Sequence, residues 1–152
     1  MRPDTRKFIH ERLAFIYEAK GMLSDAAKMH HNVALASIAF AEKKNHYMAE
    51  TELYIDAGQL DMADQALKNA MRDASPSEKA EIFVEIKNYY KRHAEILEFK
   101  RRKNHAVKIY EKLLSMDISM IEKRQIKTKL MELYENLGMI REYMALKREG
   151  EQ

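Results

Sequence analysis

A short pattern that occurs four times constrains the fold of this 152-residue chain more than any other feature. In its best-preserved copy, Tyr54 is followed four positions later by Gly58, and Ala63 comes five positions after that. Glycine readily takes the left-handed conformation with which many helices end. Apolar residues at helical spacing lie on both sides of each copy. The pattern therefore predicts four helical hairpins, each with its turn at this position.

The four turns recur at regular distances. They lie at positions 21, 58, 101 and 138, so successive copies are separated by 37, 43 and 37 residues. Such a period is typical of helical repeat arrays, because one hairpin cannot bury both faces whereas stacked hairpins share a core. The repeat-defining residues are Tyr17, Gly21 and Ala26 in the first copy, Tyr54, Gly58 and Ala63 in the second, Leu97 and Ala106 in the third, and Tyr134 and Gly138 in the fourth.

The chain is expected to be all-α and to form a single domain over residues 1–152. The approximate hairpins are 5–43, 44–75, 77–117 and 119–149. Glycine and proline are scarce, at four and two residues, which leaves few tight turns and favours long helices.

Four local features of these helices are predicted from residue type. The second helix should extend from Ser24 to about Lys43. Pro76 should stop a helix, with Ser77 capping the next one. Asn104 should take the left-handed conformation, or act as a helix cap, in the third turn, which has no glycine. Ser119 or Asp117 should cap the seventh helix.

The repeated pattern resembles the tetratricopeptide repeat (TPR). That family has an aromatic residue near the end of the first helix, a glycine turn and a small residue five positions later, with small residues where the helices cross. The second copy carries the resemblance best, whereas the third has Arg101 for the glycine and the fourth has Tyr143 for the alanine. The resemblance implies a right-handed superhelical array of hairpins, an α-solenoid, that acts as a protein-interaction scaffold or adaptor.

In this family the first helix of each repeat lines a concave groove that binds a helical or extended segment of a partner protein. Carried over position by position, five residues of each repeat face the groove. They are Phe8, Glu11, Phe15, Glu18 and Ala19 in the first repeat, Asn45, Met48, Glu52, Ile55 and Asp56 in the second, Asn88, Lys91, Glu95, Glu98 and Phe99 in the third, and Gln125, Thr128, Glu132, Glu135 and Asn136 in the fourth. Such a groove would be partly apolar and rich in carboxylates, and an amphipathic helix with a basic edge would suit it. Phe8 and Phe15 could equally be core residues, because one sequence does not determine helix rotation.

Two other partners are consistent with the sequence. A basic patch of Lys91, Arg92, Lys100, Arg101, Arg102 and Lys103 could bind the phosphates of a nucleic acid or an acidic surface. A solvated turn is the commoner meaning of such charges, and the formal net charge of +3 is a weak bias. The last hairpin could instead form a homodimer, since the ends of repeat arrays need a cover. Its apolar residues are Met139, Ile140, Met144 and Leu146.

Neither enzymatic nor metal chemistry is indicated by the sequence. It contains no cysteine, no glycine-rich phosphate loop and no glycine-flanked serine. His30 and His31 are the most metal-like pair, but adjacent side chains on a helix diverge by about 100° and no ligand spacing completes a site. We therefore expect no catalytic residue, metal or cofactor. Without a long apolar run, we expect no membrane span and a cytoplasmic location.

Overall fold

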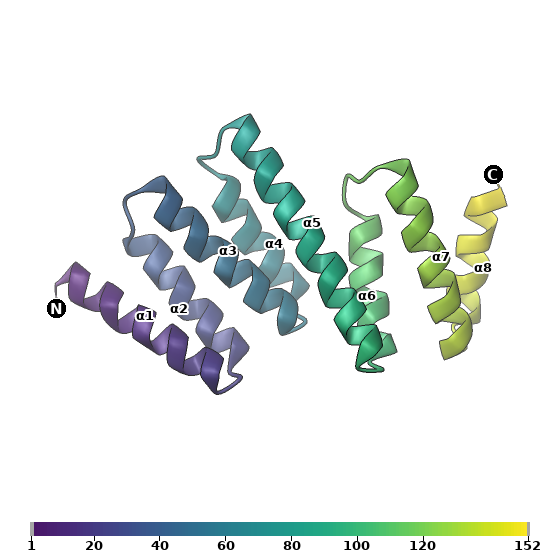
Figure 1. Cartoon of the computed structure of the whole chain (residues 1–152), viewed down its shortest axis with the longest axis horizontal. Helices are drawn as coiled ribbons and strands as arrows, with labels where there is room; N and C mark the ends of the chain where they lie inside the picture. The colour runs from purple at the N-terminus through teal and green to yellow at the C-terminus, as the bar shows by residue number, and fades with distance from the viewer. Residues whose placement is uncertain (1, 152) are drawn as a thin grey trace. The chain divides into compact units, whose positions relative to one another are not determined.

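The computed structural model describes residues 2–151, which contain eight α-helices and no β-strand (Figure 1). The all-α prediction is thereby confirmed. The helices are α1 (Pro3–Ala19), α2 (Leu23–Ala36), α3 (Phe40–Asp56), α4 (Leu60–Met71), α5 (Pro76–Phe99), α6 (Lys103–Leu114), α7 (Met120–Leu137) and α8 (Ile140–Glu151).

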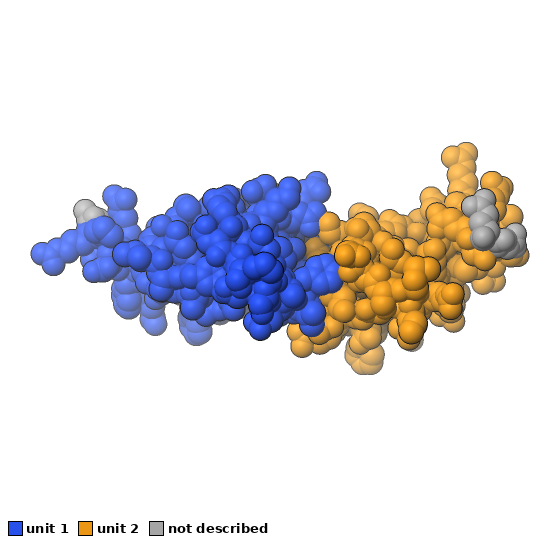
Figure 2. Space-filling view, turned by 90° about the horizontal axis from the view of Figure 1, so that it is seen from above, with its two compact units in different colours: residues 1–86 blue, residues 87–152 orange. Residues whose placement is uncertain are grey.

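The chain divides into two compact units, residues 1–86 and residues 87–152, coloured separately in Figure 2. In unit 1, α1 packs on α2, α2 on α3 and α3 on α4. In unit 2, α6 packs on α7 and α7 on α8. Helix α5 contributes its residues up to Ile86 to unit 1 and its remaining residues to unit 2.

The four repeated turns have the same backbone geometry. The turn residue is left-handed in every copy, with φ of 73° at Gly21, 75° at Gly58, 59° at Arg101 and 69° at Gly138. The next N–H donates to the carbonyl of the aromatic or leucine position five residues earlier, at 2.8–2.9 Å. This bond closes the end of the preceding helix. The prediction of a left-handed Asn104 is wrong, because Arg101, at the glycine position of the repeat, takes the left-handed conformation.

Small residues lie where the helices of each unit cross. Ala26, Ala63 and Ala106, which follow the first three turns, are fully buried. The small side chains in the first helices of these hairpins, Ala14, Thr51 and Ala94, are at most 1% exposed. Alanine lets a neighbouring helix approach closely, so these positions belong to the helix contacts. Tyr17, where the aromatic position of the first copy falls, is only half-buried, whereas Tyr54, Leu97 and Tyr134 are buried.

The second helix ends earlier than predicted, at Ala36 and not near Lys43. Ser37 takes an extended conformation, and its buried hydroxyl donates to the carbonyl of Val33 at 2.7 Å. Serine can replace the helical backbone partner of such a carbonyl with its own side chain. No glycine or proline marks this break, so it was not predicted from the alanine-rich sequence. The next helix, α3, begins at Phe40.

The cap of α5 also differs from the prediction. Pro76 is the first residue of the helix and does not end one, and Ser75 caps it in place of Ser77. The Ser75 hydroxyl accepts from the Glu78 N–H at 3.2 Å, and the Glu78 carboxylate accepts from the Ser75 N–H at 3.1 Å. Proline is favoured at the first helical position, where its missing N–H costs nothing. For α7 the predicted Ser119 cap is confirmed.

Candidate functional site

A hollow of about 540 Å³ lies on unit 2. It is formed by α5, α6 and α7 and lined by Lys91, Glu95, Tyr110, Gln125, Ile126, Thr128, Lys129 and Glu132. Tyr110 and Ile126 are buried and provide its apolar part, whereas Glu95 and Glu132 are exposed at its edge. Five of the lining residues occupy positions that the resemblance assigns to the groove, namely Lys91, Glu95, Gln125, Thr128 and Glu132.

Glu98 connects the three helices around this hollow. Its carboxylate accepts a hydrogen bond from the Tyr110 hydroxyl of α6 at 2.6 Å and pairs with the Lys129 ammonium of α7 at 3.3 Å. Burial and the neighbouring Glu98 carboxylate raise the pKa of Tyr110 well above its usual value. Tyr110 therefore stays a neutral donor, and the charge of Lys129 is balanced by a residue outside the lining.

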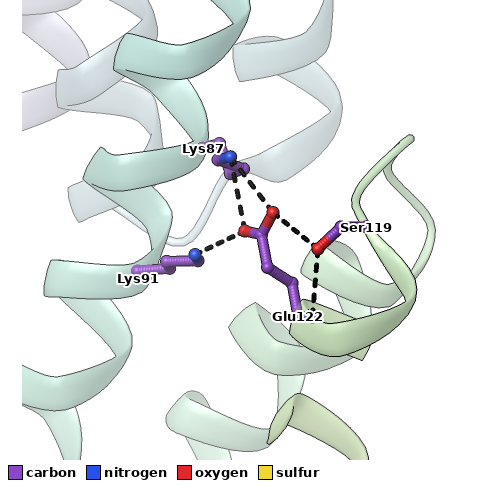
Figure 3. A network of polar contacts seen from close by, with 4 residues as sticks. All are labelled: Lys87, Lys91, Ser119 and Glu122. Carbon is purple, nitrogen blue, oxygen red and sulfur yellow. Dashed lines mark hydrogen bonds and ion pairs between the residues drawn. The ribbon is translucent and has the colours of Figure 1, made fainter. Parts of the chain in front are cut away.

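Lys91 also pairs with a carboxylate outside the lining, in a polar network on Glu122 of α7 (Figure 3). The Lys91 ammonium lies 2.5 Å from Glu122 Oε2, and the Lys87 ammonium lies 3.3 Å from the same carboxylate. The Ser119 hydroxyl donates to Glu122 Oε1 at 3.1 Å and also accepts from the Glu122 N–H as the helix cap. The hydrogen bonds from Lys91, Lys87 and Ser119 lower the pKa of Glu122 from 4.5 to about 2. The network thus joins α5 to the first turn of α7.

Replacing Glu122 with glutamine is expected to lower the free energy of unfolding by about 1 kcal/mol at pH 7, the upper range for a partly exposed ion pair. Because the folded pKa is depressed, this contribution is present above about pH 4.5 and is lost as the pH falls towards 2. Urea denaturation of both proteins between pH 7 and pH 3 measures it. Glu132→Gln on the same helix is the control and should change stability by less than about 0.5 kcal/mol. A Glu122→Gln deficit that persists undiminished at pH 3 would contradict the ion-pair explanation.

The groove positions predicted in unit 1 fall into two groups. Phe8 and Phe15 of α1 are 61% and 67% exposed, and Glu11 and Glu18 of the same helix are also exposed. In α3, by contrast, Met48 and Ile55 are 4% and 0% exposed, so both belong to the core and cannot line an open groove. Glu52, on the same helix, is half-buried.

Two more of the predicted groove residues, Asn88 and Phe99, lie on α5. Asn88 is exposed, and Phe99, the last residue of the helix, is 90% exposed. Neither lines the hollow of unit 2 as described above. Of these groove positions on α5, Lys91 and Glu95 therefore lie at the hollow, whereas Asn88 and Phe99 lie elsewhere on the surface of the same helix.

Only some residues of the predicted basic patch are exposed and without a contact to another charged or aromatic side chain that the structure describes. Lys100, Arg101 and Arg102 are exposed in the turn between α5 and α6, and Lys103 is half-buried at the start of α6. Arg92 lies over the ring of Tyr89, 5.9 Å from its centroid. Lys91 is engaged by Glu122 and does not add an unbalanced charge to this turn.

The apolar residues of the last hairpin are covered to different degrees. Ile140 and Met144 are 72% and 41% exposed, and Met139 is half-buried. Leu146 is buried within unit 2 and so offers no apolar surface to a second copy of the chain. The apolar face of α8 packs on α7 and thereby buries Leu146.

A buried carboxylate in unit 1 escaped the sequence analysis. Glu50 of α3 is 5% exposed, and its Oε1 lies 3.1 Å from His31 Nδ1 of α2. Burial raises the pKa of Glu50, and the attraction of His31 opposes that rise. The two residues also lie beside an open hollow of about 420 Å³ on the same unit. The only sequence signal for this pair is that Glu50 lies between apolar residues of α3 such as Met48 and Leu53.

No helix within residues 2–151 is both long and apolar enough to cross a membrane. Comparison with known proteins gave no match to a protein-family model, to a curated protein or to a solved structure.

Proposed function

We propose that this chain is a TPR-like helical repeat protein, a right-handed α-solenoid that acts as a binding scaffold for another protein and has no catalytic role. Two observations support a repeat. The four turns share one hydrogen-bonding geometry, and the small residues at equivalent positions of the first three hairpins are buried at helix crossings. Stacked hairpins of this kind present extended surfaces on which partners dock.

The hollow of unit 2 is the observation that carries the proposed binding role. Five of its lining residues come from the groove positions of two first helices, α5 and α7. Lys91 and Lys129 are paired with Glu122 and Glu98, outside the lining. Glu95 and Glu132 form no ion pair with the residues that the structure describes. Within the described part of the chain, Glu95 and Glu132 therefore offer unpaired carboxylates beside the apolar floor of the hollow.

An amphipathic helix with a basic edge fits this surface. Its apolar side chains would contact Tyr110 and Ile126, and its lysines or arginines would lie near Glu95 and Glu132. Such helix-in-groove recognition uses apolar anchors for affinity and charges for orientation. The partner proposed here is thus a segment of another protein with apolar residues at helical spacing and basic neighbours.

A peptide library selected on the full-length chain tests this proposal. We expect basic amphipathic peptides, and we expect the double variant Glu95→Arg/Glu132→Arg to weaken their binding at least tenfold, or about 1.4 kcal/mol. Fluorescence polarisation gives the dissociation constants, and light scattering shows whether self-association competes with the peptide.

The matched control is Asp117→Arg/Glu142→Arg, which makes the same change in net charge at exposed residues of unit 2 outside the hollow. This control should bind the selected peptides as the unmodified chain does. Equal weakening in both double variants would show that only net charge matters. Unchanged binding in both would place the peptide elsewhere on the chain, and either result would refute the proposed site.

A further inference from the structure

Three helices of unit 1 bring histidine and carboxylate side chains together near the predicted groove face of α1. One oxygen each from Glu11 and Glu42 and one ring nitrogen of His46 all lie within 4.8 Å of one another. Glu42 and His46 are four residues apart on α3 and so share one face of that helix. Glu11 comes from α1. Imidazole and carboxylate together are a donor set that suits zinc and other divalent transition metals.

Two further side chains, His30 and Glu18, orient the imidazole of this cluster. His30 Nε2 lies 3.2 Å from Glu18 Oε1, and His30 Nδ1 lies 3.0 Å from His46 Nδ1. An ionised carboxylate only accepts hydrogen bonds, so His30 Nε2 carries the proton of this contact. When His30 is neutral, its Nδ1 accepts from His46 Nδ1, and His46 Nε2 then has a lone pair and no proton. A carboxylate–imidazole chain behind a histidine is the usual support of a metal-ligating ring.

We propose that Glu11, Glu42 and His46 bind a divalent transition-metal ion of the zinc class, with His30 and Glu18 holding the His46 ring in the ligating tautomer. Three protein ligands leave a fourth coordination position open for water or another ligand. Donor atoms around tetrahedral zinc lie about 3.3–3.6 Å apart, given bonds of about 2.0–2.2 Å. Glu11 is exposed and can turn its carboxylate to reach that separation.

The Lys7 ammonium would compete with a metal ion for the Glu42 carboxylate. The ammonium pairs with Glu42, and this contact lowers the pKa of the Glu42 carboxylate. A metal ion and the Lys7 ammonium would repel each other across the same carboxylate. Removing the lysine charge should therefore strengthen metal binding, an effect that a nonspecific acidic surface site elsewhere would not produce.

Isothermal titration of the tag-free full-length chain with Zn²⁺ tests the site. We expect one ion per chain, with affinity lowered at least tenfold by Glu11→Gln or His46→Gln. His30→Gln should lower affinity by about 10–100-fold through loss of ring orientation. Lys7→Met should raise it. The matched control is His105→Gln, an exposed histidine of α6 in unit 2, which should leave the affinity unchanged.

Thermal unfolding with and without Zn²⁺ gives a second readout on the same proteins. The unfolding temperature of the unmodified chain should rise with Zn²⁺, because an ion that binds only the folded state stabilises it. The rise should vanish in Glu11→Gln, whose exposed side chain is not needed for folding. No Zn²⁺ binding by the unmodified chain, or binding that is the same in the Glu11→Gln and His46→Gln variants, would overturn the proposal.

Discussion

Replacing Ile55 with alanine is expected to lower the free energy of unfolding of unit 1 by about 3 kcal/mol, within the usual 2–5 kcal/mol for a buried large-to-small change. Ile55 is 0% exposed in α3 and lies among the largest fully buried side chains of the chain. The loss combines the transfer energy of the removed methyl and methylene groups with the cavity that they leave. Urea denaturation followed by circular dichroism measures it.

The matched control for this change is Phe15→Ala in the same unit. The resemblance placed both residues in the groove, but Phe15 is 67% exposed whereas Ile55 is fully buried. Phe15→Ala should change stability by no more than about 0.5 kcal/mol, as surface substitutions usually do. Similar losses of stability from the two substitutions would contradict the burial of Ile55 and the exposure of Phe15.

Replacing His31 with phenylalanine is expected to lower the free energy of unfolding by about 2 kcal/mol at pH 7. The ring contact with Tyr47, now 5.8 Å between centroids, can be retained, but Glu50 loses the nitrogen 3.1 Å from its carboxylate. A buried carboxylate left without its partner is strongly destabilising, by about 3–5 kcal/mol for fully buried pairs. The smaller figure applies here because the side chain of His31 is 36% exposed.

This loss should depend on pH in a definite direction. The folded pKa of Glu50 is raised, so the folded state holds the proton more tightly than the unfolded state does. Stability of His31→Phe should therefore fall as the pH rises above about 4.5, and the deficit should shrink in acid, where Glu50 is protonated. Denaturation at pH 4, 5.5 and 7 measures this trend.

The double variant His31→Phe/Glu50→Gln separates the ion pair from simple packing. Glutamine carries no charge, so most of the lost stability should return in the double variant at pH 7. If the double variant is as unstable as the sum of the two single variants, the pair does not act as a unit and the explanation fails.

The local features of the fold were largely predictable from residue type. Gly21, Gly58 and Gly138 end helices in the left-handed conformation at the predicted positions. The Ser119 cap follows from the Ser-x-x-Glu spacing to Glu122. Each of these features depends on a few consecutive residues, whose backbone preferences act over one helical turn.

The predictions failed where residue type was a poor guide to the backbone. Arg101 takes the left-handed conformation although arginine does not favour it. It does so because the helices on either side require the same turn as in the other hairpins. The end of α2 at Ala36 carries no glycine or proline and depends on the buried Ser37 hydroxyl. The regular spacing of the turns was thus a better guide to Arg101 than its residue type.

The candidate sites were less predictable than the helices. The groove positions of α5 and α7 line a hollow, whereas Met48 and Ile55 of α3 are buried. A rotation of about 100° separates adjacent helical positions, so a small error in helix orientation exchanges groove for core. Nothing in the sequence indicated that His30 and His31 of α2 have partners on α3, which are His46 and Glu50 respectively.

By itself, the sequence determined the helical class, the four turns and the small residues between helices, because these depend on local conformational preference and on periodic burial. Only the tertiary structure decided which faces are buried and which charges meet. Glu122 with Lys91, Glu50 with His31, and His30 with His46 each join different helices. Such contacts depend on how helices rotate and pack, and no spacing within one helix encodes them.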